Sequence, residues 1–289
     1  MTPLILDGGT GSELRRRGVM LSRECWSANA NLSHAELLVR IHRDYIEAGA
    51  DIVTANTFAT SRFVLAAAGL GERFGDVNRN AVDAARQAAD ESGKPVTVAA
   101  TISCLPPGFD PDAYPDPDTE YRDYAELADC FACLDVGLLV LEMLQDTDHT
   151  ALACRAASAS GLPFWAGISC RLDQSGNALV GYDNAEQPFA SILETVLRFS
   201  PSGIAVMHSP LDAIGPALGE VRRAWDGPIG AYAEITYAED PDRQRQEIVE
   251  PEDYAAAAQE WITQGATLIG GCCGTTPDHI RALRVLAGD

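Results

Sequence analysis

The chain has 289 residues, and its 46% hydrophobic content is enough for a sizeable buried core, in one large domain or two small ones. Its formal net charge of −21 would repel nucleic-acid phosphates and anionic membrane surfaces. No apolar run approaches the roughly 18 to 20 residues that cross a bilayer, and the N-terminus lacks the charged start of a signal peptide. We therefore expect a cytoplasmic protein with reduced thiols, and neither nucleic acid nor a membrane as its partner.

Short apolar runs rich in β-branched residues alternate with helix-length amphipathic stretches along the whole chain. Eight of these runs predict strands, at residues 3–7, 50–56, 95–101, 137–142, 163–169, 203–207, 228–232 and 266–270. Because the runs are almost wholly apolar, they are typical of strands that are covered on both faces. The helical patterns between them, for example 33–49, 76–93 and 251–265, begin at Ser, Asp or Pro and end at Gly.

The repeated order of strand and helix indicates the fold class. Eight such pairs without a break in composition predict a (β/α)8 barrel, and we expect a single domain over residues 1–289. A doubly wound open sheet is the alternative, but its G-x-G-x-x-G fingerprint does not match the spacing in LDGGTGSELRRRG after the first strand. Irregular segments at 104–118 and 236–249 follow strands, so we expect them on the barrel face where active sites lie.

Polar and metal-binding residue types stand at the ends of the predicted strands. They are Asp7, Asn56, Thr57, Glu142, His208, Glu234, Cys272 and Cys273. In a barrel the C-terminal strand ends converge on one pocket, so these side chains are candidates for a shared site. Neighbouring residues on an extended strand point to opposite faces. The adjacent cysteines can therefore share a target only if the backbone turns between them, and the glycines of GGCCG permit that turn.

Two thiolates and an imidazole at the ends of strands are suitable ligands for Zn²⁺, and they leave a fourth position open, with Glu234 as a candidate for it. The structural alternative is that the cysteines are small buried hydrophobes and that His208 is hydrogen-bonded in a packed loop. Asp7 could then cap a turn, and Glu142 could form a salt bridge at a strand end. The CFAC segment at 130–133 stands alone inside a helical pattern, so we interpret it as a buried helix face.

Four stretches resemble the homocysteine S-methyltransferase family: ILDGGTGSELRRRG (5–18), ADIVTANTFATSRFVLAAAGL (50–70), GLLVLEM (137–143) and TLIGGCCGTTPDHIRAL (267–283). The resemblance extends over essentially the whole chain, and GGCCGTTPDHI is highly specific. It implies a (β/α)8 barrel with Zn²⁺ as cofactor. The implied reaction is methyl transfer from a small-molecule donor to the thiol of homocysteine, which gives methionine.

The resemblance also implies roles for individual residues. Cys272 and Cys273 match the paired cysteine ligands of the family's zinc ion. A second set matches the groups that hold the amino-acid end of homocysteine, namely Asp7, Thr57, Glu142 and the backbone amides of Gly8 and Gly9. A carboxylate pair that faces the substrate ammonium, beside backbone amides for its carboxylate, is chemically suited to this task.

The chain departs from the family pattern at two strand ends. Met207-His208 stands where the family has an Asn-Cys pair that supplies the first zinc ligand, and Glu234 stands at an asparagine position. We expect His208 to replace the missing thiolate, which lowers the negative charge on the metal centre and suits a sulfonium or quaternary ammonium donor. The alternatives are a different thiol or selenol acceptor, a separate corrinoid protein as methyl source, or a non-catalytic metal-binding barrel that Glu234 closes.

Overall fold

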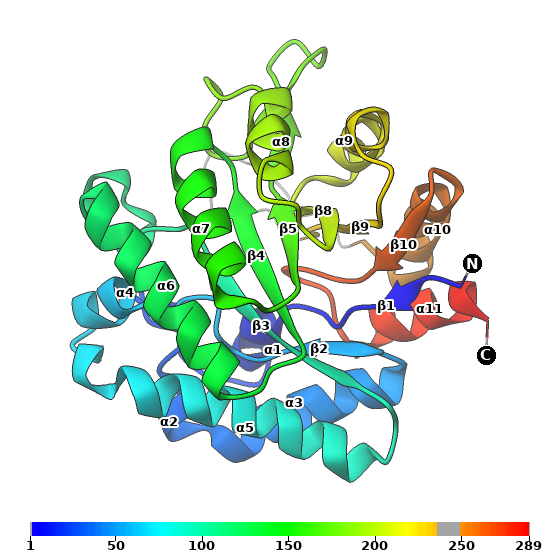
Figure 1. Cartoon of the computed structure of the whole chain (residues 1–289). Coiled ribbons are helices and arrows are strands. Elements are labelled where there is room, and N and C mark those ends of the chain that lie inside the picture. Colours follow the sequence, from blue (N-terminus) through cyan, green and yellow to red (C-terminus); the bar gives the residue numbers. More distant parts are fainter. Residues whose placement is uncertain (1, 236–248, 289) are drawn as a thin grey trace.

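A nearly closed ring of parallel strands forms the centre of the molecule (Figure 1). The computed structural model of the protein describes residues 2–235 and 249–288. Eight strands form the ring: β1 (Leu4–Ile5), β2 (Ile52–Thr54), β3 (Thr97–Ser103), β4 (Leu138–Leu144), β5 (Phe164–Ile168), β8 (Gly203–Met207), β9 (Ile229–Tyr232) and β10 (Ala266–Ile269). A parallel bridge between Leu6 and Ile52 joins the first strand to the second. The predicted single-domain (β/α)8 barrel is therefore confirmed, while its extent over residues 1–289 stays a prediction.

Helices surround this ring and cover its outer face (Figure 1). The described residues contain eleven α-helices: α1 (Thr10–Arg16), α2 (Ala30–Ser33), α3 (Ala35–Ala48), α4 (Arg62–Ala67), α5 (Phe74–Ser92), α6 (Pro117–Cys133), α7 (Thr147–Ser160), α8 (Phe189–Leu197), α9 (Leu211–Ala224), α10 (Pro251–Thr263) and α11 (Pro277–Ala287). Short 3₁₀ helices add Gly71–Arg73, Pro107–Phe109 and Pro111–Ala113. Because β1 pairs with β10, the first and last strands of the chain are neighbours in the ring.

The ends of the helices follow from local sequence signals. The predicted helices at 33–49, 76–93 and 251–265 correspond to α3, α5 and α10, with ends that agree within two residues. Gly49 and Gly93 end the first two in left-handed conformations, with φ of 112° and 64°. A residue with a Cβ adopts this conformation only at a steric cost, which is why glycine is the usual stop.

An antiparallel hairpin follows β5 and was not predicted. It pairs β6 (Cys170–Leu172) with β7 (Leu179–Gly181). The Asp173 carboxylate organises the turn, since it accepts the backbone N–H of Asn177 at 2.9 Å and of Ala178 at 3.2 Å. Of the irregular segments, 104–118 contains two of the 3₁₀ helices and the start of α6, whereas 236–249 lies outside the described residues except for its last residue.

Two layers of apolar side chains fill the barrel and its surroundings. The outer layer lies between the strands and the helices and includes Leu14, Ile41 and Tyr45, all with no exposed surface. The inner layer fills the barrel itself and includes Val140 and Met207. Each fully buried side chain of this size contributes about 1.5 to 3 kcal/mol, so strands that are apolar on both faces stabilise both layers.

The CFAC interpretation is wrong in part. Phe131 is fully buried and Cys130 packs against the core, but Cys133 is exposed. Cys133 is the last residue of α6, and its side chain is exposed there.

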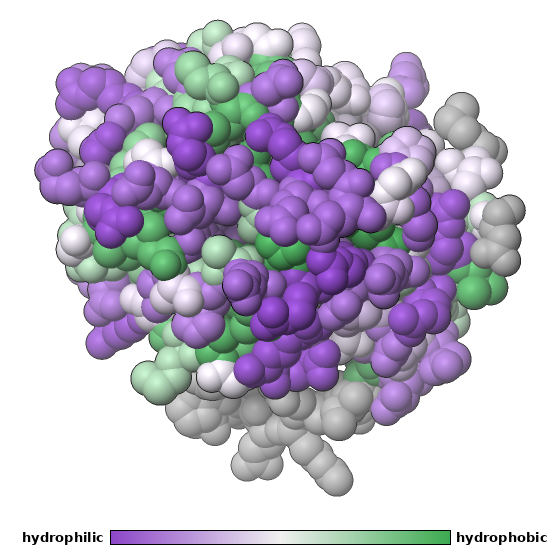
Figure 2. Space-filling view, turned by 90° about the horizontal axis from the view of Figure 1, so that it is seen from below, coloured by the Kyte–Doolittle hydropathy of each residue, from purple (hydrophilic) through white to green (hydrophobic). Residues whose placement is uncertain are grey.

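Hydrophobic residues are scattered rather than grouped on the face of the molecule that Figure 2 shows, and most of that face is hydrophilic. The large apolar residues with high exposure are Leu4, Met20 and Val285, which belong to separate segments of the described chain. Within the described residues, every helix is too short or too polar to cross a bilayer.

Candidate metal centre and substrate site

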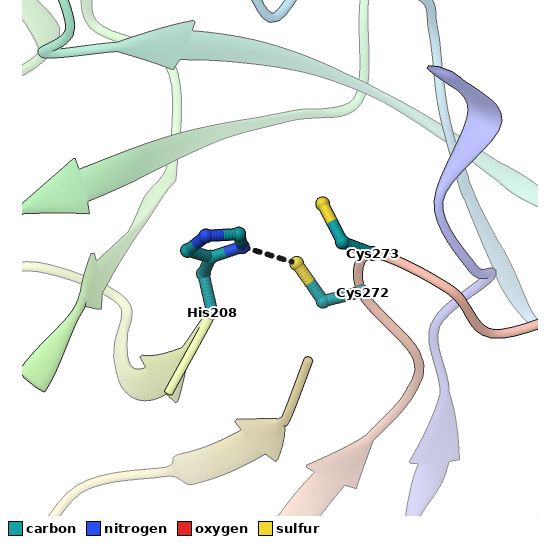
Figure 3. Close-up of side chains that lie close together, drawn as sticks. All are labelled: His208, Cys272 and Cys273. Carbon is teal, nitrogen blue, oxygen red and sulfur yellow. Dashed lines mark hydrogen bonds between the residues drawn. The ribbon is translucent and has the colours of Figure 1, made fainter. Parts of the chain in front are cut away.

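Two strand ends bring a histidine and two cysteines together. His208 directly follows β8, and Cys272 and Cys273 lie in the turn after β10. Figure 3 shows the three side chains converging on one space. Their ligand atoms all lie within 4.8 Å of one another, and Cys272 Sγ is 3.4 Å from His208 Nδ1. The structure thus places the three predicted ligands in one cluster.

The backbone is shaped to produce this convergence. His208 has a φ of 42°, in the left-handed region that non-glycine residues seldom occupy. Its N–H donates to the carbonyl of Tyr232 at 3.1 Å, which ties the end of β8 to β9. In the cysteine turn, a Cβ on Gly271 would stand 2.2 Å from Thr275 Oγ1, so only glycine fits there. Gly274 has a φ of 85° and completes the turn.

The two thiols differ in their acidity. A hydrogen bond from Cys272 lowers the pKa of Cys273 well below its usual range, against the effect of burial and with help from His208. The same hydrogen bond, together with burial, raises the pKa of Cys272. Burial disfavours the imidazolium of His208, but the Cys273 thiolate and Glu234 outweigh it and raise the pKa of His208 to about 9. The cluster therefore favours a thiolate, which is the form that binds metals.

The fourth candidate ligand lies on the other side of the imidazole. Glu234 Oε2 is 3.5 Å from His208 Nε2, and the Tyr182 hydroxyl donates a hydrogen bond to Glu234 Oε1. Among the described residues, the cluster of metal-binding atoms comprises His208, Cys272 and Cys273, without Glu234. The carboxylate therefore contacts the ligand histidine rather than the centre of the cluster.

Two carboxyl groups lie near this centre: Glu142 acts electrostatically on Cys272, and Asp7 acts on Glu142. Asp7 is 1% exposed, and burial raises its pKa to about 8 despite hydrogen bonds from Thr54. Burial also raises the pKa of Glu142 to about 8, with further contributions from Cys273 and Asp7. No hydrogen bond from a described residue contributes to this shift of Glu142. This carboxyl is thus available to a ligand, whereas Asp7 is already held by the scaffold.

Thr57 lies within the scaffold rather than on an open surface. Its side chain is fully buried, and its Oγ1 donates to the carbonyl of Thr101 at 3.1 Å and accepts the N–H of Thr101 at 2.8 Å. The hydroxyl therefore fastens the end of β2 to β3. As it stands, Thr57 supports the site and offers no free hydrogen-bonding group to a substrate.

Gly8 and Gly9 allow two loops to approach each other closely. A Cβ on Gly8 would stand 2.7 Å from Thr275 Oγ1, and a Cβ on Gly9 would stand 2.8 Å from the carbonyl oxygen of Cys272. The loop after β1 therefore packs directly on the cysteine turn. This contact places the first loop against the backbone of Cys272.

Two tyrosines lie near the site, and one of them, Tyr182, was missed in the sequence. Tyr182 follows the hairpin, and no local signal pointed to it because the hairpin strands have only three residues each. Tyr232 ends β9, is 2% exposed, and its hydroxyl has no hydrogen-bond partner among the described residues. Its position at the end of a predicted strand was visible in the sequence. Buried tyrosine hydroxyls ordinarily have a hydrogen-bond partner, so the unpartnered hydroxyl is unusual.

The donor set fits a zinc ion. From typical bond lengths, sulfur and nitrogen ligands around tetrahedral zinc lie about 3.5 to 3.8 Å apart. The 3.4 Å between Cys272 Sγ and His208 Nδ1 is close to this spacing. Two thiols and one imidazole leave one position for a substrate, as in reactive zinc sites.

A (β/α)8 barrel whose thiols, imidazole and carboxyls gather at the C-terminal strand ends has the architecture of a barrel enzyme. The family model of homocysteine S-methyltransferase matches residues 4–286, and the chain belongs to this family. It is therefore an S-methyltransferase, and the family transfers methyl groups to thiols or selenols.

Individual relatives are distant but match over nearly the whole chain. A selenocysteine methyltransferase of Astragalus bisulcatus is 26% identical, with 96% of this chain and 90% of the relative covered. Betaine–homocysteine S-methyltransferase 1 of Rattus norvegicus is 28% identical, with coverages of 97% and 71%. The metallated homocysteine methyltransferase MmuM of Escherichia coli is 22% identical and shares the fold with a TM-score of 0.80, over 99% of this chain and 96% of the other.

Proposed function

We propose that this S-methyltransferase methylates the thiol of homocysteine to give methionine, with Zn²⁺ held by His208, Cys272 and Cys273. The observation that carries the proposal is the cluster of three soft ligand atoms within 4.8 Å. The adjacent carboxyls of Asp7 and Glu142 support an amino-acid substrate, because they can face its ammonium group.

Zinc held by these residues would supply one element of chemistry: it would lower the pKa of a bound substrate thiol, which is otherwise mostly protonated at neutral pH. The protein's own groups bind and orient the substrate. Arrival of an ammonium group favours the ionised form of a carboxyl, so the raised pKa values of Asp7 and Glu142 would fall on binding. The charge pair that results requires a ligand with an ammonium group. Orientation of the thiol toward the donor then supplies much of the rate enhancement.

We infer a sulfonium or quaternary ammonium compound as the methyl donor. Imidazole in place of a thiolate reduces the negative charge on the metal centre by one unit. The substrate sulfur is then less basic and less nucleophilic, so an activated methyl group is favoured. The similarity to an enzyme whose name includes betaine supports this class of donor.

The backbone amides of Gly8 and Gly9 are proposed to receive the substrate carboxylate. They lie in the loop that packs on the cysteine turn, so an amino acid could bridge this loop and the thiols. Thr57 is assigned a supporting role in the same site, since its hydroxyl is already bonded to β3.

The described cysteines are all free, which supports a reducing cytoplasm as the location.

Selenocysteine is a second candidate acceptor, because a selenocysteine methyltransferase is among the similar proteins. The test is to load the purified protein with zinc and measure product formation. Homocysteine and selenocysteine are offered in turn, each with S-methylmethionine, betaine or S-adenosylmethionine. The proposal requires that homocysteine have the higher kcat/KM, and a higher value for selenocysteine would reverse the assignment.

The metal assignment is tested separately from activity. Zinc content per chain is measured for the wild type and for Cys272→Ser and Cys273→Ser, with Cys133→Ser as the exposed control. We expect both site variants to lose zinc and the control to retain it. Unaltered zinc content in the site variants would refute the ligand assignment. Loss of zinc without loss of methylation would show that the ion is not needed for the reaction.

A further inference from the structure

The hairpin β6–β7 brings a tyrosine to the candidate metal centre. Tyr182 directly follows β7, and its ring centroid lies 4.9 Å from that of His208. Its hydroxyl donates a hydrogen bond to Glu234 Oε1. Its backbone is also fixed, since its N–H donates to the carbonyl of Ser169 at 3.2 Å and its carbonyl accepts from Arg171 Nε at 2.8 Å. The hydroxyl therefore holds one oxygen of Glu234 from a well-supported position.

The two ring nitrogens of His208 face different groups. Nδ1 lies 3.4 Å from Cys272 Sγ, whereas Nε2 lies 3.5 Å from Glu234 Oε2. These nitrogens point to different sides of the imidazole, and the group at one of them determines which carries the proton. The Nε2 atom therefore faces a carboxylate, and the Nδ1 atom faces a sulfur.

The Glu234 carboxylate is buried, so its stability depends on the groups that contact it. The Glu234 side chain is 2% exposed, and a carboxylate withdrawn from water needs hydrogen-bond donors. An imidazole that binds a metal ion through Nδ1 keeps its proton on Nε2 and is such a donor, with the Nδ1 lone pair directed at the cysteines. The opposite tautomer would direct a lone pair at the carboxylate and a proton at the ligand cluster. The geometry therefore favours the first tautomer.

We propose that Glu234 is a positioning residue that accepts the Nε2 proton of His208 and so fixes the tautomer whose Nδ1 can bind a metal ion, while Tyr182 holds the carboxylate in place. The inference rests on the metal centre of the proposed function. It assigns Glu234 to the imidazole rather than to the metal and leaves the fourth position to the substrate thiol. Groups in this relation to a metal-binding histidine typically change metal affinity by about 10- to 100-fold when they are replaced.

Four variants test the assignment: Glu234→Ala, Glu234→Gln, Tyr182→Phe and, as an exposed control on α8, Glu194→Ala. Zinc affinity is measured by competition with a chromophoric chelator. In parallel, ¹H–¹⁵N correlation spectra of zinc-loaded protein with ¹⁵N-labelled histidine report which ring nitrogen carries the proton. The signal of His208 is assigned by its absence from His208→Gln.

We expect the wild type and the control to bind zinc equally, with the His208 proton on Nε2. Glu234→Ala should bind zinc about 10- to 100-fold more weakly and show mixed tautomers. Glu234→Gln should stay within a few-fold of the wild type, because an amide oxygen still accepts the Nε2 proton. Tyr182→Phe should give an intermediate loss.

An alanine variant with wild-type affinity and an unchanged tautomer would overturn the proposal. A glutamine variant as weak as alanine, with a cobalt(II) spectrum that shows a lost ligand, would also overturn it and make Glu234 a ligand. If the alanine variant does not fold, an unchanged affinity and tautomer in Tyr182→Phe overturns the proposal instead. Wild-type protein that binds no zinc would refute the metal centre itself, and this outcome is distinct from zinc binding that is insensitive to Glu234.

Discussion

Replacement of Asp7 separates a structural role of this carboxyl from a role in substrate binding. Asp7 lies on the seam where β1 meets β2, the contact that nearly closes the barrel. Its Oδ2 accepts the N–H of Thr54 at 2.8 Å, and its Oδ1 accepts the hydroxyl of Thr54 at 2.9 Å. The side chain therefore takes the place of a backbone hydrogen bond between the two strands.

The two hydrogen bonds determine the expected loss of stability. Asp7→Ala leaves the Thr54 amide without an acceptor, at a cost of about 1 to 3 kcal/mol, and removes a hydroxyl bond that contributes about 0.5 to 1.5 kcal/mol. We expect the free energy of unfolding to fall by about 1.5 to 4.5 kcal/mol in total. Asp7→Asn keeps an oxygen for the amide and presents an NH₂ group to the hydroxyl, so it should lose less than about 1 kcal/mol. Because burial raises the pKa of Asp7 to about 8, loss of the charge costs little before substrate binds.

Urea unfolding measures the stability of both variants, and calorimetry on zinc-loaded protein measures homocysteine binding. If Asp7 also holds the substrate ammonium, Asp7→Asn should weaken binding about tenfold or more, since a charged hydrogen bond contributes about 1.5 to 3 kcal/mol. An asparagine variant as unstable as the alanine variant would refute the account of the seam. Wild-type homocysteine affinity in a stable asparagine variant would refute the role in substrate binding.

Three further predictions concern other parts of the molecule. Glu142→Gln should raise the KM for homocysteine about tenfold or more while urea unfolding stays unchanged, and an unchanged KM would remove Glu142 from the substrate site. Burial lowers the pKa of His42 from 6.5 to about 4, so the folded state excludes a proton that the unfolded state takes up. Stability is therefore kept above pH 6.5 and lost as the pH falls toward 4, by up to about 3 kcal/mol, and His42→Leu should flatten this acid limb of the unfolding profile. Chelation of zinc should lower the melting temperature of the wild type, with about 4 kcal/mol of stabilisation at a thousandfold excess over Kd, and should leave Cys272→Ser unaffected in calorimetry.

The sequence predicted the barrel well because its signals are local and repeated. Apolar runs of strand length and helices that end at glycine require no knowledge of distant contacts. The strands β1 and β2 are shorter than predicted, because the length of a strand depends on how far the neighbouring strand pairs with it. The residues of one apolar run do not reveal how far this pairing extends. The hairpin was missed because strands of three residues are too short to show a period.

The candidate site was predictable to the extent that it depends on strand ends. The barrel rule alone places His208 and the cysteines on one rim, and the structure brings them together. The direction of each side chain was not predictable from the rule. Thr57 turns its hydroxyl into the neighbouring strand, and Tyr182 reaches the site from a hairpin beside the rim. Both outcomes depend on lateral packing, which spacing along the chain does not specify.

The two departures from the family pattern, His208 and Glu234, lie side by side in the structure. In the sequence, His208 and Glu234 are separate changes at the ends of successive ring strands. In the structure, they lie 3.5 Å apart, because β8 and β9 are paired neighbours in the ring. An imidazole at position 208 supplies a donor that a thiolate lacks, and a buried carboxylate at position 234 requires donors. A single replacement of His208 by cysteine would remove one partner from a buried carboxylate and place a thiolate near it. The two positions are therefore expected to change together.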